Sequence, residues 1–218
     1  MRSIRVERSV ATAVRPSPRV LETAAMFGLG VDDQRRLQLV PPCEIPLPQG
    51  AVVFVTGPSG GGKSTILALI GEQCDMNSIG VIRFDQQPAM PEVPLVDVFD
   101  LPLSRVTSLL AMAGLGDAFV MLRCPCELSD GQRYRLRLAQ MIELAEREDA
   151  GAVILADEFG ATLDRQTAQI IARNVYRWTR RSGHTFVAAT SHDDLLEALQ
   201  PQVLVYKGLG EQMEVVQK

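Results

Sequence analysis

The stretch GPSGGGKST, residues 57–65, decides the fold of this chain. An apolar β-type run precedes it at residues 51–55, and a helix-like run follows at residues 66–70. The stretch fits the pattern G-x-x-x-x-G-K-[ST], a glycine-rich turn that binds phosphate between a strand and a helix. A plain glycine turn is the alternative, and the order of strand, motif and helix weighs against it.

Three kinds of group would hold the phosphate. The backbone N–H groups of such a turn point inward, and the following helix directs its positive end at the β-phosphate. Lys63 is expected to reach the β- and γ-phosphates, and the hydroxyl of Ser64 to bind Mg²⁺. Glycine allows the backbone to approach closely and to adopt positive φ. The predicted phosphate-binding residues are Gly57, Pro58, Ser59, Gly60, Gly61, Gly62, Lys63, Ser64 and Thr65.

Length and composition indicate a soluble globular domain. The 218 residues are 46% hydrophobic and 22% charged, which suits one domain with a sizeable core. No apolar run approaches the roughly 18 residues that span a bilayer, and the N-terminus lacks the apolar region of a secretory signal. The four cysteines predict reduced thiols in a cytoplasmic protein. Cys124 and Cys126 could ligate a metal, but zinc would need two further ligands.

The net charge of −4 gives no general attraction to nucleic acid. Two stretches are nevertheless basic, and each is either a solvated face or a docking surface for an acidic partner or nucleic acid. Residues 2–19 contain Arg2, Arg5, Arg8, Arg15 and Arg19, and residues 173–181 contain Arg173, Arg177, Arg180 and Arg181.

Fully apolar strand patterns alternate with helical ones along the chain, which predicts an α/β fold with a mostly parallel, covered sheet. The expected strands are residues 51–56, 80–84, 151–156, 185–190 and 203–206. The expected helices are residues 64–73, 104–113, 129–147, 164–181 and 193–199. Four prolines exclude a long helix between residues 88 and 102.

Two carboxylates end the buried strand VILADE, residues 153–158. At the carboxyl edge of a parallel sheet, Asp157 would lie beside the phosphate loop and could hold Mg²⁺, directly or through water. Glu158 points elsewhere and could polarise an attacking water.

The stretch LSDGQRYR, residues 128–135, predicts a second phosphate-binding element. Ser129 resembles a helix N-cap, and Gly131 leaves backbone amides open at the positive end of the following helix. One chain cannot easily use both elements on one γ-phosphate, whereas two chains arranged head to tail can. An ordinary helix cap is the alternative.

Together with ATLD (residues 161–164) and TSH (residues 190–192), these stretches resemble the ABC-type ATPases in motif order. They look like Walker A, the signature, Walker B, the D-loop and the switch histidine. The resemblance covers roughly residues 20–210. The pattern looks closest to a bacterial group of ABC-type ATPases, some of whose members are fused to a predicted acetyltransferase.

The resemblance implies a P-loop NTPase that sandwiches two ATP molecules in a head-to-tail homodimer and hydrolyses them with Mg²⁺. Residues 57–65 would bind ATP, with Lys63, Glu158 and His192 catalytic and His192 touching the γ-phosphate in cis. The residues expected to act across the dimer are Ser129, Gly131, Gln132 and Asp164.

Two further matches concern the magnesium ion and the adenine base of ATP. The stretch FDQQP, residues 84–88, looks like the family's Q-loop, in which Gln86 or Gln87 would bind Mg²⁺. Gln86 has the better spacing to Pro88. Phe27, in MFGLG, could stack on adenine or could instead belong to the core.

Only 23 residues separate Lys63 from Gln86, about half the family's usual distance. The antiparallel β subdomain is therefore expected to be trimmed there. We expect a single domain, with a nucleotide-binding core at residues 1–87 and 149–218 and an inserted helical subdomain with the signature at residues 88–148.

The trimmed subdomain and the proline-rich segment favour a soluble ABC protein that acts on a protein or nucleic-acid complex. The alternative is the ATP-binding subunit of a membrane transporter with separate transmembrane subunits.

Overall fold

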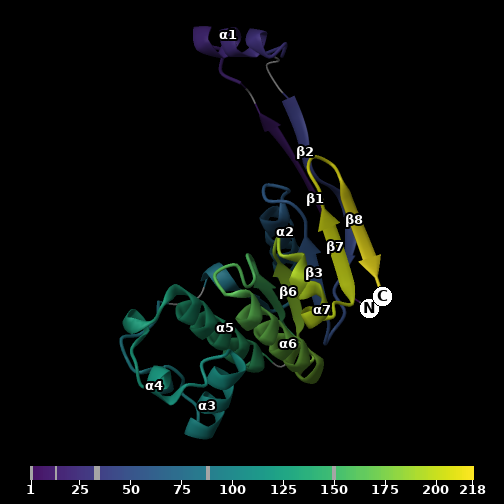
Figure 1. Ribbon diagram of the computed structural model, residues 1–218. Coiled ribbons are helices and arrows are strands. Elements are labelled where there is room, and N and C mark those ends of the chain that lie inside the picture. Colours follow the sequence, from purple (N-terminus) through teal and green to yellow (C-terminus); the bar gives the residue numbers. More distant parts are fainter. Residues whose placement is uncertain (1, 13, 32–34, 87–88, 149–150) are drawn as a thin grey trace.

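The computed structural model describes residues 2–12, 14–31, 35–86, 89–148 and 151–218. The described residues form a six-stranded sheet in the order β4-β5-β6-β3-β7-β8 (Figure 1). All neighbouring strands pair parallel except β7 and β8, so the predicted mostly parallel α/β sheet is confirmed. The strands are β3 (Val52–Thr56), β4 (Val81–Arg83), β5 (Val153–Ala156), β6 (Thr185–Ala189), β7 (Val203–Lys207) and β8 (Met213–Gln217).

The central strands are buried on both faces, which explains their nearly continuous apolar sequences. Phe54 and Phe186 pack on one side of the sheet, against helices α5 and α6. Val53, Val55 and Val187 pack on the other side with α2. The helices are α2 (Lys63–Met76), α3 (Leu103–Met112), α4 (Ala118–Met121), α5 (Asp130–Glu146), α6 (Arg165–Ser182) and α7 (Leu196–Leu199).

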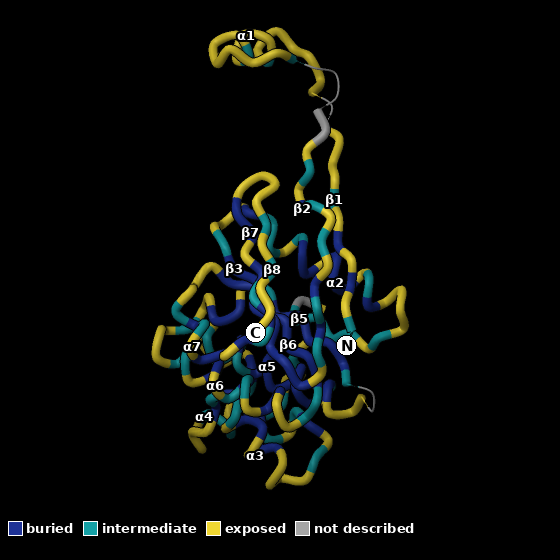
Figure 2. The backbone as a smooth tube through the Cα atoms, turned by 90° about the vertical axis from the view of Figure 1, so that its right-hand side faces the viewer, coloured by how far each residue is buried: buried dark blue, intermediate teal, exposed yellow. Residues whose placement is uncertain are grey.

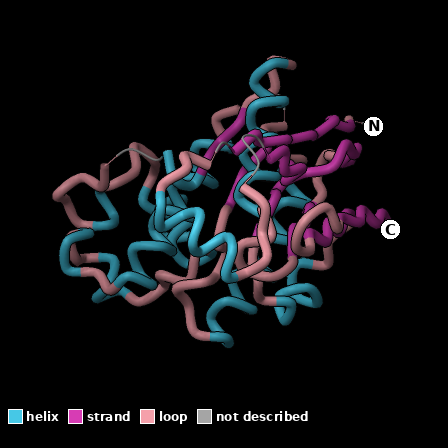
Figure 3. The backbone as a smooth tube through the Cα atoms, turned by 90° about the horizontal axis from the view of Figure 1, so that it is seen from above, coloured by secondary structure: helices cyan, strands magenta, loops and turns pink. Residues whose placement is uncertain are grey.

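Helices α3, α4 and α5 lie together at one side of the strands (Figures 1 and 3). Short 3-10 turns connect the elements: η1 (Phe84–Gln86), η2 (Leu95–Asp97), η3 (Pro125–Glu127) and η4 (Asp193–Leu195). Among the described residues of the proline-rich segment, 89–102, the only helical piece is η2, in agreement with the proline argument. No helix among the described residues is long and apolar enough to cross a membrane.

A long antiparallel hairpin, β1 (Ser3–Thr12) with β2 (Arg35–Pro46), projects from the core. Its base is buried, with Ile4, Val6 and Val40 packed against α2, whereas its distal part is mostly exposed (Figure 2). Helix α1 (Pro18–Met26) lies at the far end of the hairpin, away from the sheet (Figure 1). The sequence interpretation did not include the hairpin, α1 or β8.

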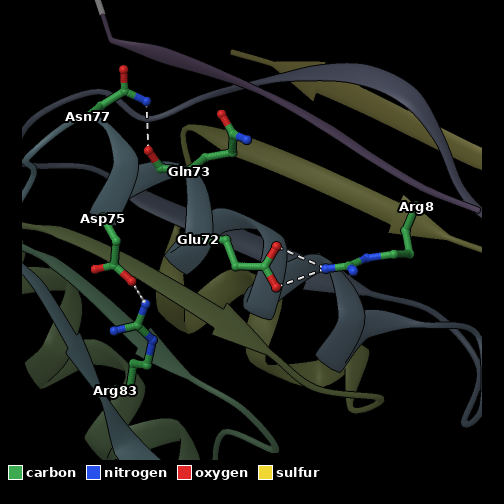
Figure 4. Close-up of polar contacts among 6 residues, drawn as sticks. All are labelled: Arg8, Glu72, Gln73, Asp75, Asn77 and Arg83. Atoms are coloured by element: carbon green, nitrogen blue, oxygen red, sulfur yellow. Dashed lines mark hydrogen bonds and ion pairs between the residues drawn. The ribbon is translucent and has the colours of Figure 1, made fainter.

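An ion pair joins the hairpin to the core. Both carboxylate oxygens of Glu72 on α2 accept hydrogen bonds from Arg8 on β1, at 2.8 and 2.9 Å (Figure 4). On the same helix, Asp75 pairs with Arg83 of β4. Between α2 and Gln86 the strand is β4, which pairs parallel with β5. Among the described residues, the antiparallel pairs are β1–β2 and β7–β8, so the antiparallel structure lies outside the short segment before Gln86, where the trimmed subdomain was expected.

A buried histidine, His184, lies in the connection between α6 and β6. Gly183 ends the helix in the left-handed conformation, at φ 77°. The next residue, His184, stacks on Trp178 with ring centroids 5.4 Å apart, and its Nδ1 accepts a hydrogen bond from the N–H of Ala152 at 2.9 Å. Burial lowers the pKa of His184. The neutral ring is therefore the form that the fold contains.

Protonation of His184 should destabilise the protein, because the charged ring would lose its acceptor nitrogen inside the core. A depressed pKa in the folded state means that the stabilisation is present above the unfolded value of about 6.5 and is lost as the pH falls below it. The pH range from about 8 to about 5 brackets the unfolded pKa. Thermal unfolding over this range should show the melting temperature falling in the wild type and falling less in His184→Asn, because the Asn amide oxygen can accept the hydrogen bond but does not titrate. Equal pH dependence in both proteins would contradict the assignment.

Candidate functional site

The phosphate-loop sequence forms the turn between β3 and α2. β3 ends at Thr56, and Lys63 is the first residue of α2. Gly57 and Gly62 have φ of 138° and 103°, a region that favours glycine. A Cβ on Gly57 would lie 2.0 Å from the carbonyl oxygen of Lys207, at the end of β7. The close approach of β7 therefore requires glycine at this position.

Lys63 folds back over the loop. Its Nζ donates to the carbonyl oxygens of Gly57 and Pro58, at 2.9 Å each. The ammonium group thus lies at the loop beside the open N-terminus of α2, where the helix amides also point. An anion in the loop would meet a fixed positive charge and unpaired N–H donors together.

A hollow of about 810 Å³ adjoins the loop. Four residues predicted from the sequence line it: Ser64 on α2, Gln86 on η1, and Asp157 and Glu158 after β5. The structure thus brings together residues that are up to 94 positions apart in the chain. Gln87, the alternative to Gln86, lies outside the described residues.

The oxygen donors in this hollow suit a magnesium ion. Ser64, Gln86 and Asp157 offer a hydroxyl, an amide and a carboxylate, and Mg²⁺ prefers such oxygen ligands together with substrate phosphates and water. No cluster of three or more His, Cys, Asp or Glu that could hold a metal occurs among the residues that the structure describes. A set of one hydroxyl, one amide and one carboxylate is of the type that shares a magnesium ion with substrate phosphates and water.

Glu158 has an unusual backbone. Its φ of 49° lies in the left-handed region, which costs free energy for a residue with a side chain. Hydrogen bonds on either side hold the turn: Phe159 N–H donates to Ala189 at 2.8 Å, and Ala161 N–H donates to Glu158 itself at 2.9 Å. The exposed carboxylate is thereby held at the mouth of the hollow.

Tyr134 supports the same turn and was missed by the sequence interpretation. It lies on α5, and its hydroxyl accepts the N–H of Gly160 at 3.0 Å. Its ring packs on Phe84, two residues before Gln86, with centroids 4.7 Å apart. Burial raises the pKa of Tyr134, so the hydroxyl stays neutral. One side chain therefore connects α5, η1 and the turn that carries Glu158.

The signature residues stand at the start of α5. Ser129 caps the helix: its hydroxyl accepts from the N–H of Gln132 at 3.3 Å, and the Gln132 amide oxygen accepts from Ser129 N–H at 3.0 Å. Gly131 packs close to the loop that contains Thr162, since a Cβ there would lie 3.4 Å from the Thr162 carbonyl. Ser129 is exposed and does not line the hollow that Ser64 lines.

Asp164 and His192 lie in the connections after β5 and β6. Asp164 caps α6 by accepting the N–H of Thr167 at 2.9 Å, and this hydrogen bonding lowers the pKa of its carboxyl. His192 is exposed, and the next residue, Asp193, accepts a hydrogen bond from the hydroxyl of Thr56. The segment that carries His192 is thereby tied to the start of the phosphate loop.

The structure does not place Phe27 near the phosphate loop. The prediction that Phe27 stacks on adenine is therefore wrong for this structure. Phe27 ends α1 at the tip of the projecting hairpin and is 72% exposed, which also excludes the core alternative. Instead β2 passes the loop, with the carbonyl oxygen of Leu39 3.9 Å from a Cβ built on Gly62. Sequence distance could not show this, because the hairpin carries residue 27 outward.

Tyr134→Phe should lower the free energy of unfolding by about 1 to 3 kcal/mol, because it leaves the buried N–H of Gly160 without an acceptor. Tyr206→Phe is a matched control that removes the hydroxyl of an exposed tyrosine and should change the stability by less than about 0.5 kcal/mol. Denaturant unfolding measures both. Equal stability losses would show that the Tyr134 hydroxyl does not support the turn.

Comparison with known proteins gives relatives of one kind. No protein-family model matches the chain. It is 28% identical over 202 residues to the lipoprotein-releasing system ATP-binding protein LolD of Bordetella pertussis, covering 75% of this chain and 82% of that protein. It is 29% identical over 194 residues to the methionine import ATP-binding protein MetN of Bradyrhizobium diazoefficiens, covering 73% of this chain and 54% of MetN.

The macrolide export ATP-binding/permease protein MacB of Marinobacter nauticus is 26% identical over 196 residues, which cover 73% of this chain and 29% of MacB. The fold matches that of MJ0796, a bacterial ABC transporter cassette solved as a dimer, with a TM-score of 0.62, 20% identity, and coverage of 84% and 93% of the two chains. A post-hydrolysis state of MJ0796 bound to ADP and Pi gives a TM-score of 0.63 at 18% identity, over 99% and 100% of the chains. The relatives and the shared fold thus support the resemblance, first indicated by the ordered motifs, of this chain to the nucleotide-binding domains of ABC-type ATPases.

Proposed function

We propose that the protein binds Mg-ATP, hydrolyses it to ADP and phosphate, and acts as the ATP-binding subunit of a membrane transporter with separate transmembrane subunits. The observation that supports hydrolysis most directly is the hollow that gathers Ser64, Gln86, Asp157 and Glu158 beside the phosphate loop. The names of LolD, MetN and MacB support the transport role. The soluble role favoured by the sequence interpretation receives no support from these relatives.

The phosphate loop, residues 57–65, would hold the triphosphate through its amides and through Lys63. Lys63 would exchange its present carbonyl acceptors for phosphate oxygens. Charge builds up on the transferred phosphoryl group during hydrolysis, and donors fixed in advance stabilise it without reorganisation. A magnesium ion held by Ser64, Gln86 and Asp157 would neutralise part of the phosphate charge when bound.

Glu158 would orient the attacking water, and His192 would contact the γ-phosphate from the same chain. The left-handed backbone at Glu158 turns its carboxylate to the mouth of the hollow, where water reaches it. The strain of that conformation is the kind that functional sites retain.

Glu158→Gln should keep ATP binding and lose steady-state turnover by about a hundredfold or more, because the amide cannot accept the water's proton. Lys63→Ala should instead weaken ATP binding by about tenfold or more, because it removes a charged donor to phosphate. Phosphate release and fluorescent-nucleotide titration measure the two effects.

Glu197→Gln is the matched control, since it makes the same change on an exposed residue of α7. Its turnover should equal that of wild type. Wild-type turnover in Glu158→Gln would refute the role of Glu158, and unchanged nucleotide affinity in Lys63→Ala would count against the phosphate loop.

Two protomers would close head to tail around two ATP molecules. In one chain Ser129, Gly131 and Gln132 do not line the hollow of Ser64, and the start of α5 faces solvent. A partner's γ-phosphate would occupy that helix end, and Asp164 would connect the two sites. The requirement for a third phosphate makes ATP, and not ADP, the trigger.

The Glu158→Gln variant should therefore be monomeric or loosely associated alone and form a closed dimer with Mg-ATP. Light scattering with ATP, with ADP and without nucleotide tests this. Ser129→Arg in the same background should abolish the dimer and spare ATP binding, whereas Ser104→Arg, on an exposed serine at the start of α3, should do neither. A dimer equally stable with ADP would exclude the sandwich.

A further inference from the structure

A second hollow, of about 620 Å³, lies between α3, the end of α5 and the second half of α6. It shares no lining residue with the hollow of Ser64 and Asp157. Arg105, Arg177, Arg181 and Glu146 supply its charged lining, so the lining carries two net positive charges on a chain whose net charge is −4. The proposed nucleotide chemistry does not use these residues.

Two of the arginines, Arg177 and Arg181, have no partner among the residues that the structure describes. Glu146 accepts hydrogen bonds from Arg105 and from the indole N–H of Trp178, the latter at 3.0 Å, so that each of its oxygens has a donor. Arg177 and Arg181 are exposed and make no hydrogen bond or ion pair with any residue that the structure describes. They stand one helical turn apart, where like charges repel.

The dipole of α6 accounts for the position of only one of these two arginines. Arg181 lies in the last turn of α6 and gains from the negative end of the helix dipole. Arg177 lies a full turn earlier, where this effect has faded. The two guanidinium groups together form a site for carboxylates, which bind arginine through paired, charge-assisted hydrogen bonds.

The apolar lining indicates what kind of molecule brings the carboxylates. Leu109, Met112 and Trp178 line the same hollow as the arginines. The Trp178 ring is only 6% exposed and already stacks on His184, so it offers no face to a nucleic-acid base. A flat lipid surface does not fill a concave site. A polypeptide with acidic and aliphatic side chains satisfies both the charge and the apolar lining.

We infer that the hollow between α3 and α6 binds an acidic segment of a protein partner, with its carboxylates on Arg177 and Arg181 and an aliphatic side chain against the half-buried Met112. This docking site goes beyond the proposed function. The occupant would touch α6 of the nucleotide-binding core and α3 beside the signature helix at once. A partner seated there would be sensitive to any movement between these two parts of the chain.

Trp178 provides the readout, because it is the single tryptophan of the sequence. The full chain is titrated with a short synthetic peptide that alternates Glu and Leu, and tryptophan fluorescence is followed. Saturable binding is expected, weakened about tenfold or more in Arg177→Ala/Arg181→Ala by the loss of two charge-assisted contacts. Arg173→Ala, on the same helix but outside the hollow, should bind like wild type.

Specificity is tested with a peptide that alternates Glu and Ser and with an oligothymidylate, both of which should bind more weakly than the Glu–Leu peptide. Basal ATP turnover should be unchanged in both arginine variants, the double variant and Arg173→Ala, which separates this site from the nucleotide site. No saturable fluorescence change, equal binding by the double variant, or tighter binding of the oligothymidylate would overturn the inference.

Discussion

The backbone contact between β7 and the phosphate loop constrains the rest of the site. The carbonyl oxygen of Lys207 occupies the space that a side chain on Gly57 would need, and it also lies close to Gly61. Lys207 is itself buried, and its ammonium donates to the carbonyls of Gly208 and Gly210, at 2.8 and 2.6 Å. The end of β7 is thus held rigidly beneath the loop, and the loop in turn sets where α2 begins and where Lys63 and Ser64 point.

The second constraint is the turn after β5. Glu158 keeps a left-handed backbone because its neighbours bond to β6 and, through Gly160, to Tyr134 on α5. Tyr134 also packs on Phe84 beside Gln86. The helix that begins with the signature is therefore mechanically connected to both the carboxylate and the amide side of the hollow. A rotation of α5 would displace all three elements together.

Much of the core could be predicted from the sequence, because buried parallel strands have nearly continuous apolar runs and the phosphate loop fixes their neighbourhood. The same reasoning placed Ser64, Asp157 and Glu158 together, whereas Gln86 was predicted only from the resemblance to the Q-loop of ABC-type ATPases. Tyr134 escaped notice because an aromatic residue on a helix is ordinarily core, and only its hydroxyl contact gives it a further role. The hairpin was not predicted because its exposed distal half lacks a buried face. Phe27 was misplaced because the hairpin carries it away from the phosphate loop.

The backbone at Glu158 has a consequence for how the protein would respond to selection. Glycine adopts φ near 49° without steric cost, and asparagine does so more easily than glutamate, so either replacement would relieve strain. Selection for heat resistance alone would therefore favour losing the carboxylate, whereas selection for turnover would retain it. At this one position, thermal stability and catalysis favour different residues. The presence of glutamate is therefore what selection for catalysis, at a cost in stability, would produce.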